Sequence, residues 1–281
     1  MGGDRNIARM GFGTMRLPAW PTGTQPNTDD AIRVLRRAVE LGVNHIDTAA
    51  FYARDGVSAN ALIREALHPY PDDLVLATKV GPRFDGTTQL PPAEPRELRA
   101  DVEHNLRELG TDRIDLVNLR VGGLEGPSDE PLSAHFAALA ELREEGLIRH
   151  LGLSNVTADR LAEAQRIAPV ASVQNHYNLA NRADDKLVDT CAEQGIGYVP
   201  FFPLGGHVDP DFLADERIVA VSRRRGATPA QVVLAWLLGR ASSMLLIPGT
   251  GSVRHLEQNI AAINVALDEH DYAELNSIGS S

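Results

Sequence analysis

Short runs of β-branched and other apolar residues alternate along the chain with longer stretches in which apolar positions recur at helical spacing. The first helical stretch shows this spacing clearly, with one apolar face formed by Ala31, Val34, Leu35, Ala38 and Leu41. Thr28 is the expected N-cap of this helix, and Gly42 follows its end. The pattern therefore predicts amphipathic helices that cover a set of buried strands.

Other helix boundaries carry signals of the same kind. Gly110 and Gly146 are expected to end two further helices, because glycine readily adopts the left-handed conformation that terminates a helix. A capping box, Thr228-Pro229-Ala230-Gln231, is expected to open another, with threonine at the cap, proline at the first helical position and glutamine at the third.

Eight strand and helix pairs follow one another without a linker rich in Pro, Gly or Ser. Eight such units in 281 residues favour a (β/α)8 barrel, forming a single domain over residues 1–281, rather than an open doubly wound sheet. The one candidate for a dinucleotide-binding turn, Gly11-Phe12-Gly13-Thr14-Met15, is not G-x-G-x-x-G, which argues against a Rossmann domain. The strands are expected to end near Gly13, Asp47, Lys79, Arg120, Ser154, Gln174, Phe201 and Pro248.

Three of the polar residues at or just after these strand ends form a set with a shared chemical use. Asp47 ends one strand, Tyr52 follows in the next loop, and Lys79 ends another strand. A phenol that donates a proton near neutral pH needs its pKa of about 10 lowered, and a nearby ammonium held by a carboxylate does this. Each residue alone also has an ordinary explanation as a cap, a packing residue or an ion-pair partner. Together they favour a general acid, Tyr52, and therefore a reductase.

Composition excludes several other classes of protein. The net charge of -11 argues against a nucleic-acid partner, because phosphate contacts need clustered Lys and Arg. No apolar stretch approaches the roughly 20 residues that cross a bilayer, and the first residues lack the apolar core of a signal peptide. The single cysteine, Cys191, cannot form an internal disulfide. A cytoplasmic protein without a membrane partner is expected.

Two other chemistries are disfavoured. His45 and Asp47 share a strand face, but no His-x-His pair accompanies them, so no metal site is expected. No G-x-S-x-G motif is present for a serine hydrolase. His176 lies two residues after Gln174 and either lines the site or is a hydrogen-bonded structural histidine.

The order of several motifs resembles the aldo-keto reductase superfamily over Gly11 to Asn259. The motifs are Gly11-Phe12-Gly13-Thr14-Met15, Asp47-Thr48-Ala49 with Tyr52, Thr78-Lys79, Asp115-Leu116-Val117-Asn118-Leu119, Gly152-Leu153-Ser154-Asn155, Gln174-Asn175, Pro203-Leu204-Gly205 and Ile247-Pro248-Gly249-Thr250. The resemblance implies a barrel that binds NADPH in extended form and passes hydride to a carbonyl carbon. It also implies that Tyr52 is the general acid, that Lys79 lowers its pKa and that Asp47 fixes Lys79.

The same resemblance assigns residues to the cofactor. It places Ser154, Asn155 and Gln174 at the nicotinamide carboxamide, which can fix the exposed face of the ring, and the ring of Phe201 stacked on the nicotinamide. The remaining implied cofactor contacts are Gly13, Thr14, Met15, Asp47, Phe202, Pro203, Leu204, Gly205, Pro248, Gly249, Thr250, Ser252, Arg254, His255, Gln258 and Asn259.

The segment from Thr250 to Asn259 is similar to the family's site for the adenosine 2′-phosphate and adenine. Ser252 is expected to cap a helix whose first amides can bind an anion, and Arg254 with His255 adds positive charge. Without the resemblance, an ordinary capped surface helix explains the same residues. The family's usual lysine and arginine are replaced by Gly249 and His255, so we expect a preference for NADPH over NADH that is smaller than usual.

Arg120 stands where most catalytic members of the family have a histidine. Arginine cannot relay a proton, but it can donate hydrogen bonds to a carbonyl or phenolate oxygen; the alternative is that it turns away and pairs with a surface carboxylate. The Leu119-Arg120 ending and the segment from Val199 to Gly206 resemble a bacterial branch of pyridoxal reductases.

Two functions stay open from the sequence. The first is NADPH-dependent reduction of an aldehyde or ketone, with pyridoxal as one candidate substrate, by a monomer or a homo-oligomer. The second is a nucleotide-sensing partner subunit with little turnover, because some members of the superfamily lack the histidine and act in this way.

Overall fold

The strands of the computed structural model form one curled parallel sheet in the order β1-β2-β5-β8-β9-β10-β11. The structure describes residues 2–24, 27–122, 126–127, 131–206 and 211–279. The sheet strands are β1 (Phe12–Gly13), β2 (His45–Asp47), β5 (Val75–Val80), β8 (Ile114–Arg120), β9 (Ile148–Ser154), β10 (Val170–His176) and β11 (Gly197–Phe201).

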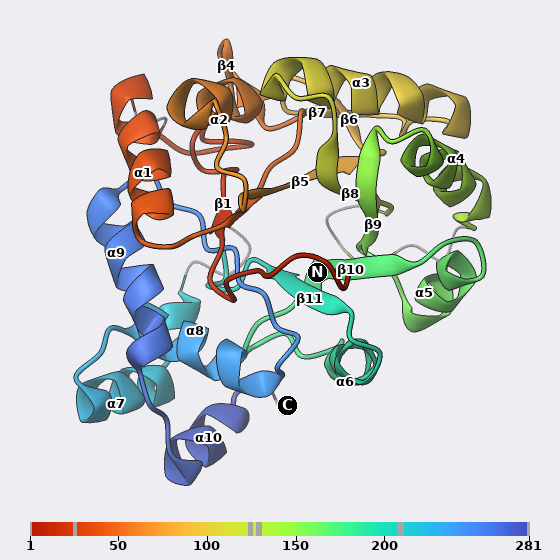
Figure 1. The fold of residues 1–281 in the computed structure, drawn as a ribbon. Helices are drawn as coiled ribbons and strands as arrows, with labels where there is room; N and C mark the ends of the chain where they lie inside the picture. Colours follow the sequence, from red (N-terminus) through yellow and green to blue (C-terminus); the bar gives the residue numbers. More distant parts are fainter. Residues whose placement is uncertain (1, 25–26, 123–125, 128–130, 207–210, 280–281) are drawn as a thin grey trace.

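Helices surround the sheet, and Figure 1 shows the strands at the centre with the helices arranged around them. The α-helices are α1 (Thr28–Glu40), α2 (Ala59–Leu67), α3 (Leu98–Leu109), α4 (Ser133–Glu144), α5 (Ala158–Gln165), α6 (Asp185–Glu193), α7 (Glu216–Arg225), α8 (Pro229–Arg240), α9 (Val253–Ala261) and α10 (Glu269–Asn276). The 3-10 helices are η1 (Pro95–Glu97), η2 (Phe212–Ala214) and η3 (Ala262–Asn264). This is the predicted (β/α)8 barrel.

The segment before Pro248 closes the barrel without forming a regular strand. Met244 bridges Tyr198 of β11, and Leu246 bridges Met10 next to β1, both in parallel. The amide of Leu246 donates to Arg9 O over 2.8 Å, so the two edges of the sheet are joined through this segment. The sequence predicted a strand here; the pairing stays short because Pro248 has no amide hydrogen to extend it.

The hydrophobic pattern explains why these elements form. All six residues of β5 are buried, as expected for a parallel strand covered on both faces. The apolar face of α1 is buried as predicted, with Leu41 half-buried at its end. The expected N-cap was wrong by one residue, because Asn27, and not Thr28, accepts a hydrogen bond from the amide of Asp30.

The other predicted helix boundaries are confirmed. Gly110 follows α3 with φ of 69°, and Gly146 lies just beyond α4 with φ of 88°. The capping box of Thr228 and Gln231 opens α8.

Two short hairpins were not predicted from the sequence. The strands β3 (Ala53–Arg54) and β4 (Val57–Ser58) pair after β2, and β6 (Arg83–Asp85) and β7 (Thr88–Leu90) pair after β5. In the second hairpin, Phe84 packs against Trp20 and Phe51 at ring-centroid distances of 5.0 and 5.3 Å. The hairpins therefore extend the carboxyl end of the barrel with an aromatic cluster.

Candidate active site

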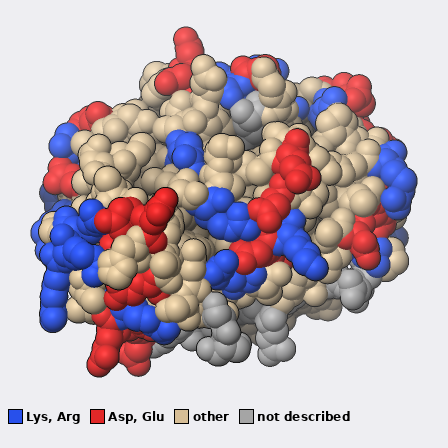
Figure 2. Space-filling view, turned by 90° about the horizontal axis from the view of Figure 1, so that it is seen from below, with Lys and Arg blue, Asp and Glu red and all other residues tan. Residues whose placement is uncertain are grey.

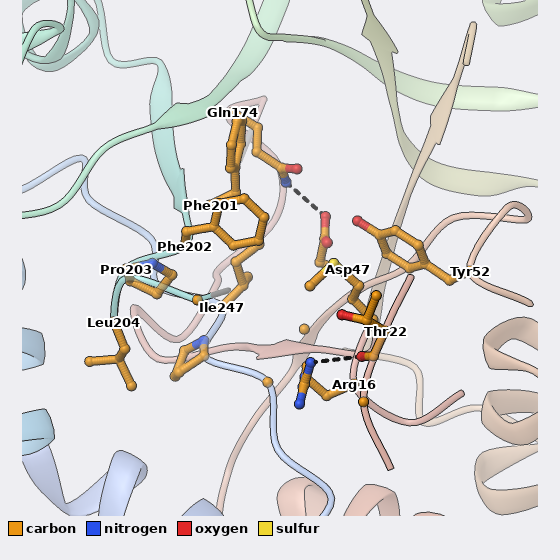
Figure 3. Close-up of a pocket in the computed structure, with 16 residues that line it drawn as sticks. Arg16, Thr22, Asp47, Tyr52, Gln174, Phe201, Phe202, Pro203, Leu204 and Ile247 are labelled. Atoms are coloured by element: carbon orange, nitrogen blue, oxygen red, sulfur yellow. Dashed lines mark hydrogen bonds between the residues drawn. The ribbon is translucent and has the colours of Figure 1, made fainter. Parts of the chain in front are cut away.

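A cleft of about 420 Å³ opens at the carboxyl end of the barrel strands. Parallel strands bring their last residues to one end of a barrel, so side chains from β2, β10 and β11 meet here. The residues that line the cleft are Gly13, Met15, Arg16, Thr22, Gly23, Asp47, Tyr52, Gln174, Phe201, Phe202, Pro203, Leu204, Gly206, Ile247, Pro248 and Gly249 (Figure 3).

A buried ion pair lies at the base of the cleft. Lys79 Nζ donates to Asp47 Oδ1 over 2.5 Å and to the carbonyl of Thr48 over 3.1 Å. The other carboxylate oxygen of Asp47 accepts from Gln174 Nε2 over 2.8 Å. Burial lowers the pKa of Lys79, but the Asp47 carboxylate and the Tyr52 phenol outweigh that effect and raise the pKa above its usual value. Lys79 is therefore a held ammonium ion.

Tyr52 lies beside this ion pair and also lines the cleft. Lys79 Nζ is 5.0 Å from the centroid of its ring, and Figure 3 shows the Tyr52 hydroxyl turned toward Asp47. The ring packs against Trp20 and Phe51 at 5.3 and 5.0 Å, which leaves the side chain only 8% exposed. The structure thus brings together the three residues that the sequence singled out, with Tyr52 and Asp47 lining the cleft and Lys79 behind them.

Arg120, at the end of β8, turns toward this site. Its Nη1 donates to Ser154 Oγ over 3.1 Å, and its guanidinium carbon lies 4.9 Å from the centroid of the Phe201 ring. Burial lowers the pKa of Arg120, while Tyr52 and Asp47 act in the opposite direction. No carboxylate of the described residues forms an ion pair with it, so the pairing with a surface carboxylate that the sequence left open is not seen.

The three predicted carboxamide ligands have different surroundings. Ser154 binds Arg120, whereas Asn155 donates from Nδ2 to the carbonyls of Val121 and Gly126 over 2.9 and 2.7 Å. Gln174 Oε1 is buried and has no hydrogen-bond partner among the described residues. Because an unmet buried acceptor is costly, this atom suits a ligand that brings a donor.

His176 proves to be a hydrogen-bonded residue behind the wall of the cleft. Its Nδ1 is 2.9 Å from Asn181 Nδ2, and its ring stacks on Phe201 with centroids 5.5 Å apart. Burial lowers the pKa of His176. It supports Phe201 and does not line the cleft, which agrees with the structural alternative.

The other end of the cleft carries a cation that the sequence analysis missed. Arg16 lines the cleft and donates to the carbonyl of Thr22 over 3.2 Å (Figure 3). The sequence could have indicated Arg16, because it follows the end of β1 by three residues and lies next to Met15. The resemblance had already assigned Met15 and Gly13 to the cofactor. The other lining residues missed from the sequence are Thr22, Gly23, Gly206 and Ile247.

Gly249 has a structural reason to differ from the lysine often found in the family. A Cβ at Gly249 would lie 2.4 Å from the carbonyl oxygen of Gly13, and a Cβ at Gly13 would lie 2.6 Å from that of Ile247. With the backbone in this conformation, a side chain at either position would force the two segments to move apart. Gly249 therefore permits the close approach of the two segments seen in this chain.

The helix predicted for phosphate binding is α9, and Ser252 caps it as expected by accepting from the amide of His255. Arg254 and His255 are exposed, and Arg254 Nη2 lies 2.9 Å from His255 Nε2. Of the remaining predicted contacts, Thr14 donates from Oγ1 to the carbonyl of Asp47 over 3.0 Å. Thr14 does not line the cleft. The same holds for four more of the predicted cofactor contacts, Gly205, Thr250, Gln258 and Asn259.

No group of three or more potential metal ligands is found among the described residues. Within the described ranges, no helix is both long and apolar enough to cross a membrane. On the face seen in Figure 2, acidic and basic side chains are interspersed, without a continuous basic surface.

Comparisons with known proteins agree with this geometry. The model of the aldo/keto reductase family matches residues 9–280. Pyridoxine 4-dehydrogenase from Escherichia coli (strain K12) is 48% identical over 281 residues, which cover 98% of this chain and 96% of that protein. This likeness agrees with the narrower resemblance to pyridoxal reductases.

Solved structures with the same fold are also aldo-keto reductases. A thermostable aldo-keto reductase in complex with the inhibitor epalrestat has a TM-score of 0.83 and 28% identity, with 98% of this chain and 97% of that chain covered. An aldo/keto reductase from Klebsiella pneumoniae in complex with NADP and acetate has a TM-score of 0.81 and 27% identity, with coverage of 100% and 94%. The chain therefore belongs to the aldo/keto reductase family of oxidoreductases.

Proposed function

We propose that this protein reduces the carbonyl group of an aldehyde or ketone to an alcohol with NADP(H), with Tyr52 as general acid. The observation that carries the proposal is the buried ion pair of Asp47 and Lys79 beside a phenol that faces the cleft. A tyrosine placed only for packing needs no buried ammonium next to its ring. The cation becomes useful when the phenol gives up its proton.

The cleft has features that fit NADP(H), which supplies the hydride. Gln174 Oε1 offers an acceptor without a protein partner among the described residues, at the end of the cleft near Tyr52. Ser154, Asn155 and Gln174 are the proposed ligands of the carboxamide. Arg16 at the other end and the first turn of α9 are proposed to hold the phosphates, since helix N-termini and guanidinium groups both bind anions.

Side chains of the protein supply the proton and polarise the carbonyl group of the substrate. The hydroxyl of Tyr52 donates a proton to the carbonyl oxygen, and the Lys79 ammonium stabilises the phenolate that remains. Arg120 donates a hydrogen bond to the same oxygen as negative charge develops on it. One hydride to the carbon and one proton to the oxygen complete the alcohol.

Pyridoxal is the substrate that we propose first. The support comes from 48% identity to pyridoxine 4-dehydrogenase over almost the whole of both chains. Pyridoxal carries a phenolic hydroxyl beside its aldehyde, and Arg120 is a cation that can bind the corresponding phenolate. We further propose that the enzyme acts in the cytoplasm.

The nucleotide-sensing partner subunit is the second candidate, favoured only by the replacement of histidine with Arg120. Steady oxidation of NADPH, followed by absorbance with pyridoxal, aromatic aldehydes, aliphatic aldehydes and ketones, separates the two. Sustained turnover with at least one of these carbonyls supports the enzyme. Nucleotide binding without turnover on any of them supports the partner subunit.

A further inference from the structure

The site combines one acidic side chain with several basic ones. Asp47 and Arg16 are the charged residues that line the cleft, and two further cations contact its lining residues: Lys79 pairs with Asp47, and Arg120 lies over Phe201. Both oxygens of Asp47 are already used, one by Lys79 and one by Gln174. The charge of Arg120 is therefore not neutralised by a carboxylate in this part of the structure.

The position of this charge is fixed by its neighbours. Arg120 is bonded to Ser154 and lies over Phe201, which are two of the residues proposed to hold the nicotinamide. Phe201 is in turn held by the stacked ring of His176, and His176 is held by Asn181. Because Ser154 and Phe201 hold the Arg120 guanidinium, it stays close to a nicotinamide bound at these residues. A guanidinium also keeps its positive charge near neutral pH.

The two forms of the cofactor respond differently to a nearby cation. The nicotinamide ring is positively charged in NADP⁺ and neutral in NADPH. Two unit charges a few Å apart in a partly buried site repel strongly enough to change an equilibrium constant by about tenfold or more. A neutral histidine at the same position exerts no such repulsion.

We infer that Arg120 makes the protein discriminate between the redox forms of its cofactor, binding NADPH more tightly than NADP⁺. This inference rests on the proposed function, because it requires the nicotinamide to bind in the cleft. It assigns to Arg120 a role in cofactor selection that is separate from hydrogen bonding to the substrate.

The test is equilibrium titration of each nucleotide, without substrate, into the wild-type protein and four variants. Quenching of intrinsic fluorescence gives the dissociation constants of NADP⁺ and NADPH, and their ratio is the readout. The variants are Arg120→Met and Arg120→Gln, which remove the charge, Arg120→Lys, which keeps it, and Arg166→Met, which removes an exposed charge after α5.

In the two neutral variants, we expect the ratio to fall about tenfold, mainly because NADP⁺ binds more tightly. Arg120→Lys and Arg166→Met should keep the wild-type ratio within about threefold. An unchanged ratio in both neutral variants that still bind NADPH overturns the inference. A wild-type protein that binds neither nucleotide contradicts the proposed function instead, so the two failures are distinguishable.

Discussion

Arg120 makes the clearest residue-scale prediction about the substrate. If its guanidinium donates to the carbonyl oxygen, Arg120→Met should lower kcat/KM. The fall should correspond to a loss of about 2–4 kcal/mol in transition-state stabilisation, the usual effect of removing one oxyanion donor. Substrates with an acidic hydroxyl beside the carbonyl, such as pyridoxal, should lose more than plain aldehydes because Arg120 also pairs with their phenolate. Steady-state kinetics with matched pairs of aldehydes measure both effects.

Arg120→Lys is the control for that prediction, because it retains a positive charge without the planar donor pair. It should recover part of the loss for phenolic substrates. Small and equal losses for every substrate in Arg120→Met would show that Arg120 does not act on the substrate.

The ion pair of Asp47 and Lys79 makes a second prediction, about stability. Lys79→Met leaves a carboxylate that is 2% exposed without its cation, and this should lower the free energy of unfolding by about 3–5 kcal/mol. The double variant Asp47→Asn with Lys79→Met removes both charges and should regain most of that loss, yet stay inactive. Urea denaturation followed by circular dichroism tests this; a double variant as unstable as the single one contradicts it.

At the scale of elements, α9 is predicted to select the cofactor's 2′-phosphate. Arg254 and His255 are exposed in its first turn, where the helix amides also favour an anion. Replacing both by alanine should reduce the preference for NADPH over NADH about tenfold, and added salt should reduce it in the wild type. Fluorescence titration with both nucleotides measures the preference.

Arg33→Ala, which removes an exposed arginine from α1, is the matched control and should leave that preference unchanged. Equal affinity of the wild-type protein for NADPH and NADH would refute the assignment of α9 to the phosphate.

Glu163 of α5 links its helix to the start of α4 and makes the pH prediction. It accepts from the amides of Leu132 and Ser133 over 3.1 and 2.9 Å and pairs with Arg160. The hydrogen bond from the Ser133 hydroxyl, helped by Arg160, outweighs burial and lowers the pKa of Glu163 to about 2.

A depressed pKa in the folded state means that this stabilisation is complete above the unfolded value of 4.5 and is lost as pH falls toward about 2. The difference in Tm between the wild type and Glu163→Gln should therefore be constant above about pH 5 and shrink below it. Thermal melts across this range test it; a difference that grows with acidification contradicts it.

The elements themselves were largely predictable where one periodicity dominated. The helix α1 followed from its apolar face, and Gly110 and Gly146 marked helix ends because only a left-handed conformation suits those positions. The hairpins of β3–β4 and β6–β7 escaped prediction because strands of two or three residues are too short to show alternation. Thr28 and Asn27 can both cap a helix, and local backbone geometry decided between them.

At the scale of the whole molecule, the sequence predicted the barrel and the end that carries the candidate site, but not the contacts between distant segments. Asp47, Tyr52 and Lys79 were found because each lies at or just after the end of a predicted strand. The bond from Arg120 to Ser154 joins strand ends 34 positions apart, and the place of Arg16 depends on how the loop after β1 folds back. Such contacts follow from closure of the barrel, which no local pattern encodes; the single-domain expectation stays a prediction.

The central claim is that Tyr52 is the proton donor in NADPH-dependent carbonyl reduction, and the rate of NADPH oxidation by wild type and Tyr52→Phe with the same carbonyl tests it most directly. Because the variant loses the acidic hydroxyl and little else, kcat should fall by roughly 10²–10⁴ while NADPH affinity stays nearly unchanged. Single-turnover measurements ensure that the chemical step is observed. If Tyr52→Phe kept more than about a third of the wild-type rate in that step, Tyr52 would not be the general acid.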